Sequence, residues 1–293
     1  MHVPVMVREV LEGLALEPGD LLLDCTLGLG GHAREFLKRG VRVVGVELNP
    51  ETREFADYSG VEVLAGSYAE LLELWDREER PKGALFDLGL SSFLLEGVAR
   101  GFSFRYPDEP LDMRFDPSRG RPAWWWLDRL TPDELAEVLK LYGEVRRARA
   151  IAREIVRRRP MRKVGELVEA VAAAAGRNPL PQVFQALRIL VNDELASLAV
   201  GLAAAAQLLL VGGRLAVISY HSLEDRVAKA LKDVPGLRPL NKKPITPSPE
   251  EVAANPRARS AKLRLYEKTE EINAQDAFGH LSRRLPPRPR GLA

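Results

Sequence analysis

The chain contains a glycine-rich segment directly after an apolar run, a pattern typical of loops that bind a nucleotide-sized ligand. Residues 21–33 read LLLDCTLGLGGHA, so an apolar run leads to a carboxylate and then to glycines. Gly28, Gly30 and Ala33 formally match the dinucleotide fingerprint, and Glu47 ends the next apolar run, where a ribose-binding acid is expected. One interpretation of this segment is therefore an NAD-dependent oxidoreductase.

The charge of the segment favours a different ligand. Asp24 stands four residues before Gly28, where its carboxylate would repel a pyrophosphate. S-adenosylmethionine instead carries an ammonium, a sulfonium and a carboxylate. The carboxylate can accept N–H bonds from the loop and from the start of the next helix, while Asp24 and Asp87 face the positive groups. We therefore predict a methyl-donor site, and the oxidoreductase remains the alternative.

Two side chains near other strand ends could complete this site. Both carboxylate oxygens of Glu47 can accept hydrogen bonds from ribose hydroxyls, or Glu47 is an exposed acid at the end of a strand. Tyr68 follows the third apolar run and lies either against an adenine ring or in the core. Cys25 is predicted to be a small buried residue, because no basic group adjoins it to form a thiolate.

The elements that must position these residues alternate along the chain. Apolar runs alternate with helical patterns, and a late run at 260–268 is expected to be a final edge strand; the earlier runs lie at 21–25, 41–47, 61–66, 83–89 and 213–220. This alternation predicts an α/β fold with a doubly wound, mostly parallel sheet. The carboxyl ends of parallel strands meet at one edge, which would bring Asp24, Glu47 and Asp87 together.

A long segment between the fourth and fifth runs predicts an inserted subdomain. The two runs are 124 residues apart, far more than one crossover helix needs. The segment has helical patterns: Thr131 and Pro132 are a cap and a first helical residue, and further helices are expected at 148–159, 164–175 and, broken, 183–210. We therefore predict a discontinuous domain of residues 1–104 and 200–293 and an all-helical insert of residues 105–199.

Basic residues concentrate in this insert. Residues 146–163 hold nine Lys and Arg against one Glu, a net charge of +8, so the rest of the chain sums to −6 against a total of +2. Such segregation is typical of a surface for a polyanion, or of a solvated helix face. The candidate contacts are Arg146, Arg147, Arg149, Arg153, Arg157 and Arg158.

Composition argues against several other classes. The single cysteine excludes an intramolecular disulfide and a cysteine-cluster metal site, as expected of a cytoplasmic protein, and the four histidines lack metal-ligand spacing, so no metal is expected. The first residues do not resemble a signal peptide. The uncharged stretch 195–213 is better explained by a buried helix that leads into a strand than by a membrane span.

Longer motifs, in order along the chain, connect these features to one family. They are HVPVM, DCTLGLGGH, FDLGLSS, RGFSFR, PLDMRFDP, FQALRILVNDEL, GGRLAVISYHSLEDR, KKPITPS and NPRARSAKLR. Together they resemble the bacterial MraW-type (RsmH) 16S ribosomal RNA cytidine-N(4) methyltransferases. The resemblance implies a class I methyltransferase fold, S-adenosylmethionine as cofactor, and methylation of the cytidine at position 1402 of 16S rRNA in the small ribosomal subunit. It also implies cofactor contacts at Gly30, Gly31, His32, Glu47, Tyr68 and Asp87.

The exocyclic amine of cytosine is a poor nucleophile, because its lone pair is delocalised into the ring. Acceptors must therefore hold the amino group toward the methyl donor. Asp87 is expected to support the cofactor amine, with Ser91 or Ser92 as the acceptor. His221 either accepts the amine proton or fixes its turn through hydrogen bonds.

Two further questions stay open at the level of the sequence. The run Trp124 to Trp126 is either partly buried between helices of the insert or stacks on bases. A non-catalytic RNA-binding assembly factor that retains a methyl-donor fold is a second alternative to the enzyme.

Overall fold

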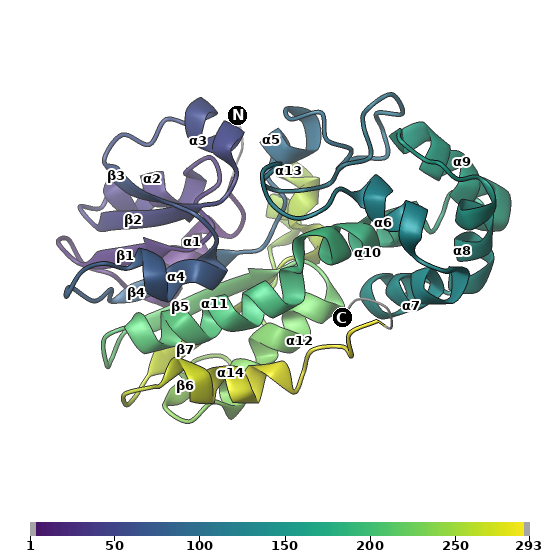
Figure 1. Ribbon diagram of the computed structural model, residues 1–293. Helices are drawn as coiled ribbons and strands as arrows, with labels where there is room; N and C mark the ends of the chain where they lie inside the picture. Colours follow the sequence, from purple (N-terminus) through teal and green to yellow (C-terminus); the bar gives the residue numbers. More distant parts are fainter. Residues whose placement is uncertain (1–3, 290–293) are drawn as a thin grey trace. The chain divides into compact units, whose positions relative to one another are not determined.

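The computed structural model describes residues 4–289, and the side chain of Ser92 lies outside this description. The chain forms two compact units, Met1–Ser91 with Leu195–Leu285 and Ser92–Glu194 with Pro286–Ala293 (Figure 1). We refer to them as the sheet unit and the helical unit.

The boundaries between the units lie earlier than the predicted positions 104/105 and 199/200. The Arg100 guanidinium donates to the carbonyl oxygens of Arg114 and Phe115, at 2.8 and 3.2 Å, and the Gly101 amide donates to the Glu109 carboxylate at 2.9 Å. These bonds join residues 100 and 101 to residues 109–115 within the helical unit, which begins at Ser92. The sequence did not reveal this, because the bonds join irregular segments that lack a periodic pattern.

The sheet unit is built on a seven-stranded sheet with strand order β3-β2-β1-β4-β5-β7-β6. The strands are β1 Leu21–Asp24, β2 Arg42–Glu47, β3 Val61–Ala65, β4 Gly83–Asp87, β5 Arg214–Ser219, β6 Leu237–Pro239 and β7 Lys262–Lys268. The first five are parallel, whereas β7 is antiparallel to both β5 and β6. The prediction of a doubly wound, mostly parallel sheet is therefore confirmed.

The prediction that 260–268 forms an edge strand is wrong. Strand β7 lies between β5 and β6, so β6 is the edge. β6 has only three residues, of which Arg238 and Pro239 are exposed, and it offers no apolar alternation to detect.

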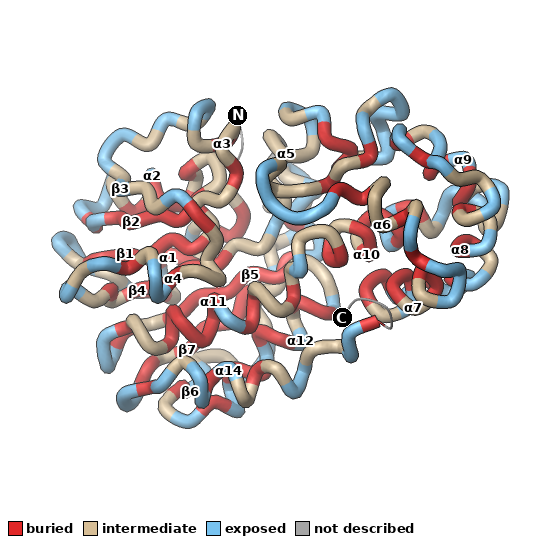
Figure 2. Tube along the Cα trace, viewed as in Figure 1, coloured by how far each residue is buried: buried red, intermediate tan, exposed pale blue. Residues whose placement is uncertain are grey.

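Helices cover both faces of this sheet, which explains why the central strands are apolar along their whole length. Leu23, Phe86 and Val217 belong to a core cluster with α11, while Leu22 and Leu85 belong to a second cluster with α1 and α2. Figure 2 shows the central strands largely buried. The helices of the unit are α1 Val7–Leu14, α2 Gly31–Leu37, α3 Pro50–Phe55, α4 Leu71–Leu74, α11 Glu194–Leu208, α12 Ser222–Ala230, α13 Pro249–Ala254 and α14 Ala274–Ser282.

Two basic side chains, those of Lys268 and Arg80, cap the carboxyl end of α11. Lys268 is fully buried, and its ammonium donates to the carbonyl oxygens of Gln207 and Leu209 at 2.9 and 2.8 Å. The Arg80 guanidinium donates to the carbonyl oxygen of Leu208 at 3.0 Å. These contacts satisfy acceptors that the helix leaves unpaired at its end.

The helical unit contains α5 Ser92–Glu96, α6 Ala123–Arg129, α7 Pro132–Gly143, α8 Ala148–Arg157, α9 Val164–Ala175 and α10 Leu180–Asn192. The Thr131 cap of α7 is confirmed, because the Glu134 amide donates to the Thr131 hydroxyl at 3.3 Å and the Glu134 carboxylate accepts from the Thr131 amide at 2.7 Å. The break predicted within 183–210 falls at Asp193, which has a left-handed φ of 48°.

Helix α11 and strand β5 confirm the buried helix and the following strand that the sequence indicates at 195–213. Among residues 4–289, no single helix has the length and apolar character needed to cross a membrane. The consecutive helices α10 and α11, which meet at a bend, meet those criteria only when taken together, by length and composition.

Candidate functional site

Three acidic residues lie at the carboxyl edge of the sheet. Strand β1 is flanked by β2 and β4, and all three run in the same direction, so Asp24, Glu47 and Asp87 end neighbouring strands at one edge. The juxtaposition predicted from the strand pattern is therefore present.

The glycine loop that follows β1 is held against this edge. The Thr26 hydroxyl accepts the Asp87 amide at 2.6 Å, and the Leu27 amide donates to the Val46 carbonyl oxygen at 3.1 Å. Gly28 and Gly30 have φ values of 51° and 72°, in the left-handed region that favours glycine. The loop thus lies across three strand ends and leads directly into α2 at Gly31.

Glu47 is positioned by two backbone amides. Its Oε2 accepts the Gly28 amide at 2.9 Å and its Oε1 accepts the Asn49 amide at 2.7 Å. Burial raises the pKa of Glu47 to about 7, although both amides act in the opposite direction. Each oxygen retains acceptor capacity, so the carboxylate can also accept from a pair of vicinal hydroxyls.

Asp24, His32 and Asp87 form a buried charged group beneath the loop. Asp24 is 2% exposed, and burial raises its pKa to about 6. The His32 Nε2 lies 3.4 Å from Asp87 Oδ2, and no hydrogen-bond partner for this buried nitrogen exists among the described residues. Burial lowers the pKa of His32, but the Asp87 and Asp24 carboxylates outweigh it and raise the pKa overall.

Tyr220 completes this group from the end of β5. Its hydroxyl donates to Asp87 Oδ1 at 2.8 Å, and a Cβ at Gly89 would lie 2.8 Å from its ring. Burial tends to raise the pKa of Asp87, but His32, Tyr220 and the Gly89 amide outweigh it and lower the pKa. The surroundings thus stabilise the ionised form of Asp87, in contrast to that of Asp24.

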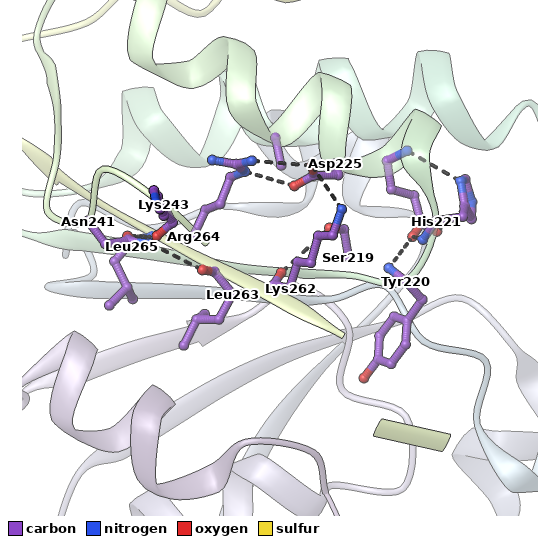
Figure 3. A network of polar contacts seen from close by, with 12 residues as sticks. Ser219, Tyr220, His221, Asp225, Asn241, Lys243, Lys262, Leu263, Arg264 and Leu265 are labelled. Carbon is purple, nitrogen blue, oxygen red and sulfur yellow. Dashed lines mark hydrogen bonds and ion pairs between the residues drawn. The ribbon is translucent and has the colours of Figure 1, made fainter. Parts of the chain in front are cut away.

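His221 serves as the cap of α12, which favours the second of its two predicted roles. Its Nδ1 accepts the Glu224 amide at 3.4 Å, and the Glu224 carboxylate accepts the amides of Tyr220 and His221 at 2.8 and 3.3 Å. The imidazole Nε2 lies 3.0 Å from the same carboxylate. Figure 3 shows the His221 ring and the Tyr220 phenol pointing in different directions.

The remaining candidates are Tyr68, Ser91 and Ser92. Tyr68 is half-buried, with its ring centroid 5.5 Å from that of Phe86, so it packs on the core at the end of β4. Ser91 is also half-buried, four residues after Asp87. The side chain of Ser92 lies outside the described residues. Two residues that hold the glycine loop were not predicted from the sequence. They are Thr26 and Tyr58, and the Tyr58 hydroxyl donates to the Gly28 carbonyl oxygen at 2.5 Å.

The candidate arginines of the helical unit differ in their pairing. Helix α8 turns Ile151 and Ile155 inward, whereas Arg149, Arg153 and Arg157 are exposed. The Glu154 carboxylate accepts from both Arg157 and Arg158 at 2.6 Å, and these bonds lower its pKa to about 2. No ion pair within residues 4–289 involves the other four candidates, which are Arg146, Arg147, Arg149 and Arg153.

A groove beside these arginines is lined by both acidic and basic side chains. Its volume is about 1110 Å³, and it is lined by Glu134, Glu137 and Lys140 of α7 and by Arg146 and Arg149 near the start of α8. The carboxylates of Glu134 and Glu137 would repel a polyanion in the groove, so the exposed face of α8 is the better candidate surface.

Among the described residues, no group of three or more His, Cys, Asp or Glu is arranged to hold a metal ion.

The strand order, with β7 inserted antiparallel between β5 and β6, defines a class I methyltransferase fold together with the glycine loop after β1. The chain belongs to the MraW methylase family, whose model matches residues 1–269.

Three relatives carry the name "Ribosomal RNA small subunit methyltransferase H". The protein of Thermotoga neapolitana is 44% identical over 291 residues, which cover 92% of this chain and 97% of that protein. The Stenotrophomonas maltophilia K279a protein is 43% identical over 304 residues, covering 92% and 94% of the two chains. The Nostoc punctiforme protein is 44% identical over 286 residues, covering 91% and 94%.

Proposed function

We propose that this protein transfers a methyl group from S-adenosylmethionine to the exocyclic N(4) amine of the cytidine at position 1402 of 16S rRNA, within the small ribosomal subunit. The observation that carries the proposal is the group of three acids and His32 around the glycine loop, in a chain of the MraW methylase family. The names of the relatives support ribosomal RNA of the small subunit as the substrate.

The residues present fit this cofactor in charge. A ligand with an ammonium and a sulfonium would relieve the burial penalty of Asp24 and Asp87, which lack a permanent cation of Lys or Arg in their hydrogen bonds. Glu47 offers two oxygens to the ribose hydroxyls. The His32 Nε2 is buried and has only the 3.4 Å contact with Asp87 among the described residues, so it keeps capacity for a stronger hydrogen bond to a ligand.

The chain's contribution to the reaction is mainly positioning. When bound, the cofactor supplies a methyl group on a positively charged sulfur. Asp87, oriented by Tyr220 and His32, would accept from the cofactor ammonium, and Glu47 would accept from the ribose. Ser91 is the described candidate for holding the cytosine amine, and Ser92 stays a prediction. His221 is assigned to fixing the turn after β5.

The target base must leave its stack to reach such a site, because an amine within a paired helix is not accessible to the donor. Exposed arginines of α8 would hold phosphates of the RNA, and such contacts make binding salt-dependent. We assign this role to Arg149 and Arg153 in preference to Arg157 and Arg158, because Glu154 already neutralises part of the charge of the second pair.

Two alternatives are less well supported by the site. An NAD-dependent enzyme would have to place a pyrophosphate beside the buried carboxylates of Asp24 and Asp87, which is electrostatically unfavourable. A non-catalytic assembly factor would not need a site with this charge distribution. Calorimetric titration with NAD and with S-adenosylmethionine distinguishes the NAD-dependent enzyme from the methyltransferase. A methyl-transfer assay distinguishes the assembly factor from the methyltransferase.

The decisive experiment is methyl transfer to purified small ribosomal subunits, followed by mapping of the modified nucleotide by mass spectrometry. With methyl-labelled S-adenosylmethionine, we expect label on one cytidine, at position 1402. Asp87→Asn should abolish the label, while Lys232→Gln, a change at an exposed lysine of the sheet unit, should preserve it. Binding of subunits without transfer of label by the wild-type protein would instead identify an assembly factor.

A further inference from the structure

Helix α6 presents three consecutive tryptophans, all of them half-buried. The rings of Trp125 and Trp126 meet edge to face, with centroids 5.0 Å apart and an interplanar angle of 84°. Trp126 also has a buried indole nitrogen. Trp126 thus acts as a support that fixes the orientation of the Trp125 ring, while part of Trp125 stays accessible.

Two arginines accompany Trp125 at intervals of four residues. Arg121 precedes the helix and Arg129 ends it, and their guanidinium carbons lie 5.4 and 4.2 Å from the Trp125 ring centroid. Both arginines are exposed, and within residues 4–289 neither forms an ion pair with a carboxylate. A half-buried indole therefore carries over its ring two positive charges that the described protein does not neutralise with a carboxylate.

The neighbouring Trp124 has the same kind of contact but a different charge balance. The Arg162 guanidinium carbon lies 4.5 Å from the Trp124 ring centroid, and Arg162 also pairs with Asp128 at 2.7 Å. This arrangement satisfies the arginine internally, as expected of a contact that only stabilises the fold. Trp124 therefore provides a matched internal comparison for Trp125.

We propose that Trp125, Arg121 and Arg129 form a stacking site for an unpaired base of the RNA substrate. A purine or pyrimidine face stacks on an indole regardless of base identity, and a guanidinium can stack on the same layer or bind the adjacent phosphate. Both guanidinium groups lie over the Trp125 ring, so a base would stack on the outer side of a guanidinium or displace one from the ring, and the arginine released could then bind the adjacent phosphate. The site rests on the proposed function only in that the substrate is RNA.

The tryptophan content of the chain allows a direct optical test. The chain has four tryptophans, and the fourth, Trp75, is a buried residue of the sheet unit. In a Trp75→Phe variant of the full chain, all tryptophan fluorescence therefore comes from α6. We expect a single-stranded RNA oligonucleotide spanning the target cytidine to quench this fluorescence on binding, and a duplex of the same sequence to quench it much less.

Affinity measurements on full-length variants locate the effect. Trp125→Leu should weaken binding of the single-stranded RNA by between about 5-fold and 150-fold, the range that stacking of one base provides, while Trp125→Phe should retain most of the affinity. Trp124→Leu should change the affinity less than about twofold. Replacing both Arg121 and Arg129 with Gln should lower the slope of log affinity against log salt by about 1.4, or about 0.7 for each arginine that no longer pairs with a phosphate.

The outcomes separate this site from the proposed function. Unchanged α6 fluorescence at RNA concentrations that saturate filter binding overturns the stacking site, and so does an equal loss of affinity in the Trp124→Leu and Trp125→Leu variants. Methyl transfer by the wild-type protein is measured in parallel. Label transfer without quenching rejects the stacking site alone, whereas quenching without label transfer rejects the enzyme and supports the stacking site. Circular dichroism and thermal unfolding verify that each variant is folded.

Discussion

Acidification should weaken S-adenosylmethionine binding, because Glu47 must be ionised to accept from both ribose hydroxyls. With a pKa of about 7, Glu47 is about 10% protonated at pH 8 and about 90% protonated at pH 6. If only the ionised form binds well, the dissociation constant should rise about tenfold between these two pH values. Asp24, with a pKa of about 6, should add about a further twofold at pH 6 and a steeper decline below it.

The Glu47→Gln variant tests the assignment to this residue. An amide can accept at only one of its two positions, and the charge of the acceptor is lost. Loss of a hydrogen bond to a charged group is worth about 1.5–3 kcal/mol, so binding at pH 8 should weaken by about 10-fold to 150-fold. Between pH 8 and pH 6, the affinity of the variant should vary much less than that of the wild-type protein.

Isothermal titration calorimetry at pH 6, 7 and 8 measures both effects. Repeating the pH 7 titration in two buffers of different ionisation enthalpy counts the protons released, and Glu47 should release about half a proton on binding. The matched control is Glu73→Gln, a change at an exposed acid on α4, which should keep the wild-type profile. A wild-type affinity that is constant from pH 6 to 8, or a Glu47→Gln variant with the wild-type slope, refutes the reasoning.

Three further predictions concern Asp87, the end of α11 and the α8 face. Tyr220→Phe removes the hydroxyl that donates to Asp87, so cofactor binding should weaken about tenfold by calorimetry, with RNA affinity unchanged; a loss of RNA affinity of the same size would contradict this assignment. Lys268→Met leaves the carbonyls of Gln207 and Leu209, at the end of α11, with fewer donors, so it should lower the free energy of unfolding by about 1–3 kcal/mol in urea titrations. The exposed control Lys229→Met should change the free energy of unfolding by less than about 0.5 kcal/mol. Replacing Arg149 and Arg153 with Gln should lower the salt dependence of RNA binding more than replacing Arg157 and Arg158, and equal effects would show that Glu154 does not neutralise the second pair.

The sheet and its acidic edge were predictable because their signals are local. Apolar runs mark parallel strands covered on both faces, and the strand ends follow directly from where those runs stop. The glycines of the loop are needed for backbone conformations at Gly28 and Gly30 that other residues rarely adopt. Both signals lie within a few residues of the feature that they predict.

The features that the sequence did not predict depend on contacts between distant segments. That Tyr220 reaches the site follows from its place after the fifth apolar run, but its hydrogen bond to Asp87, 133 residues away in the chain, depends on the parallel pairing of β4 and β5. The short β6 likewise exists because β7 is there to pair with it. His221 is an intermediate case, because His221-x-x-Glu224 has the spacing of a capping box, although histidine is not a common residue at its first position.

The opposite pKa shifts of Asp24 and Asp87 give the two buried acids different roles under the proposed function. Asp87 accepts from the Tyr220 hydroxyl and lies beside His32, so it stays ionised without a ligand. Asp24 accepts from the Thr26 amide at 3.1 Å, which does not offset its burial, and its pKa rises to about 6. At about pH 6 and below, a cation that binds near both acids meets an ionised Asp87 and favours ionisation of Asp24 by lowering its pKa. At about pH 6 and below, protonation of Asp24 relieves the repulsion between the two carboxylates in the free protein, and the bound ligand stabilises the state in which both are charged.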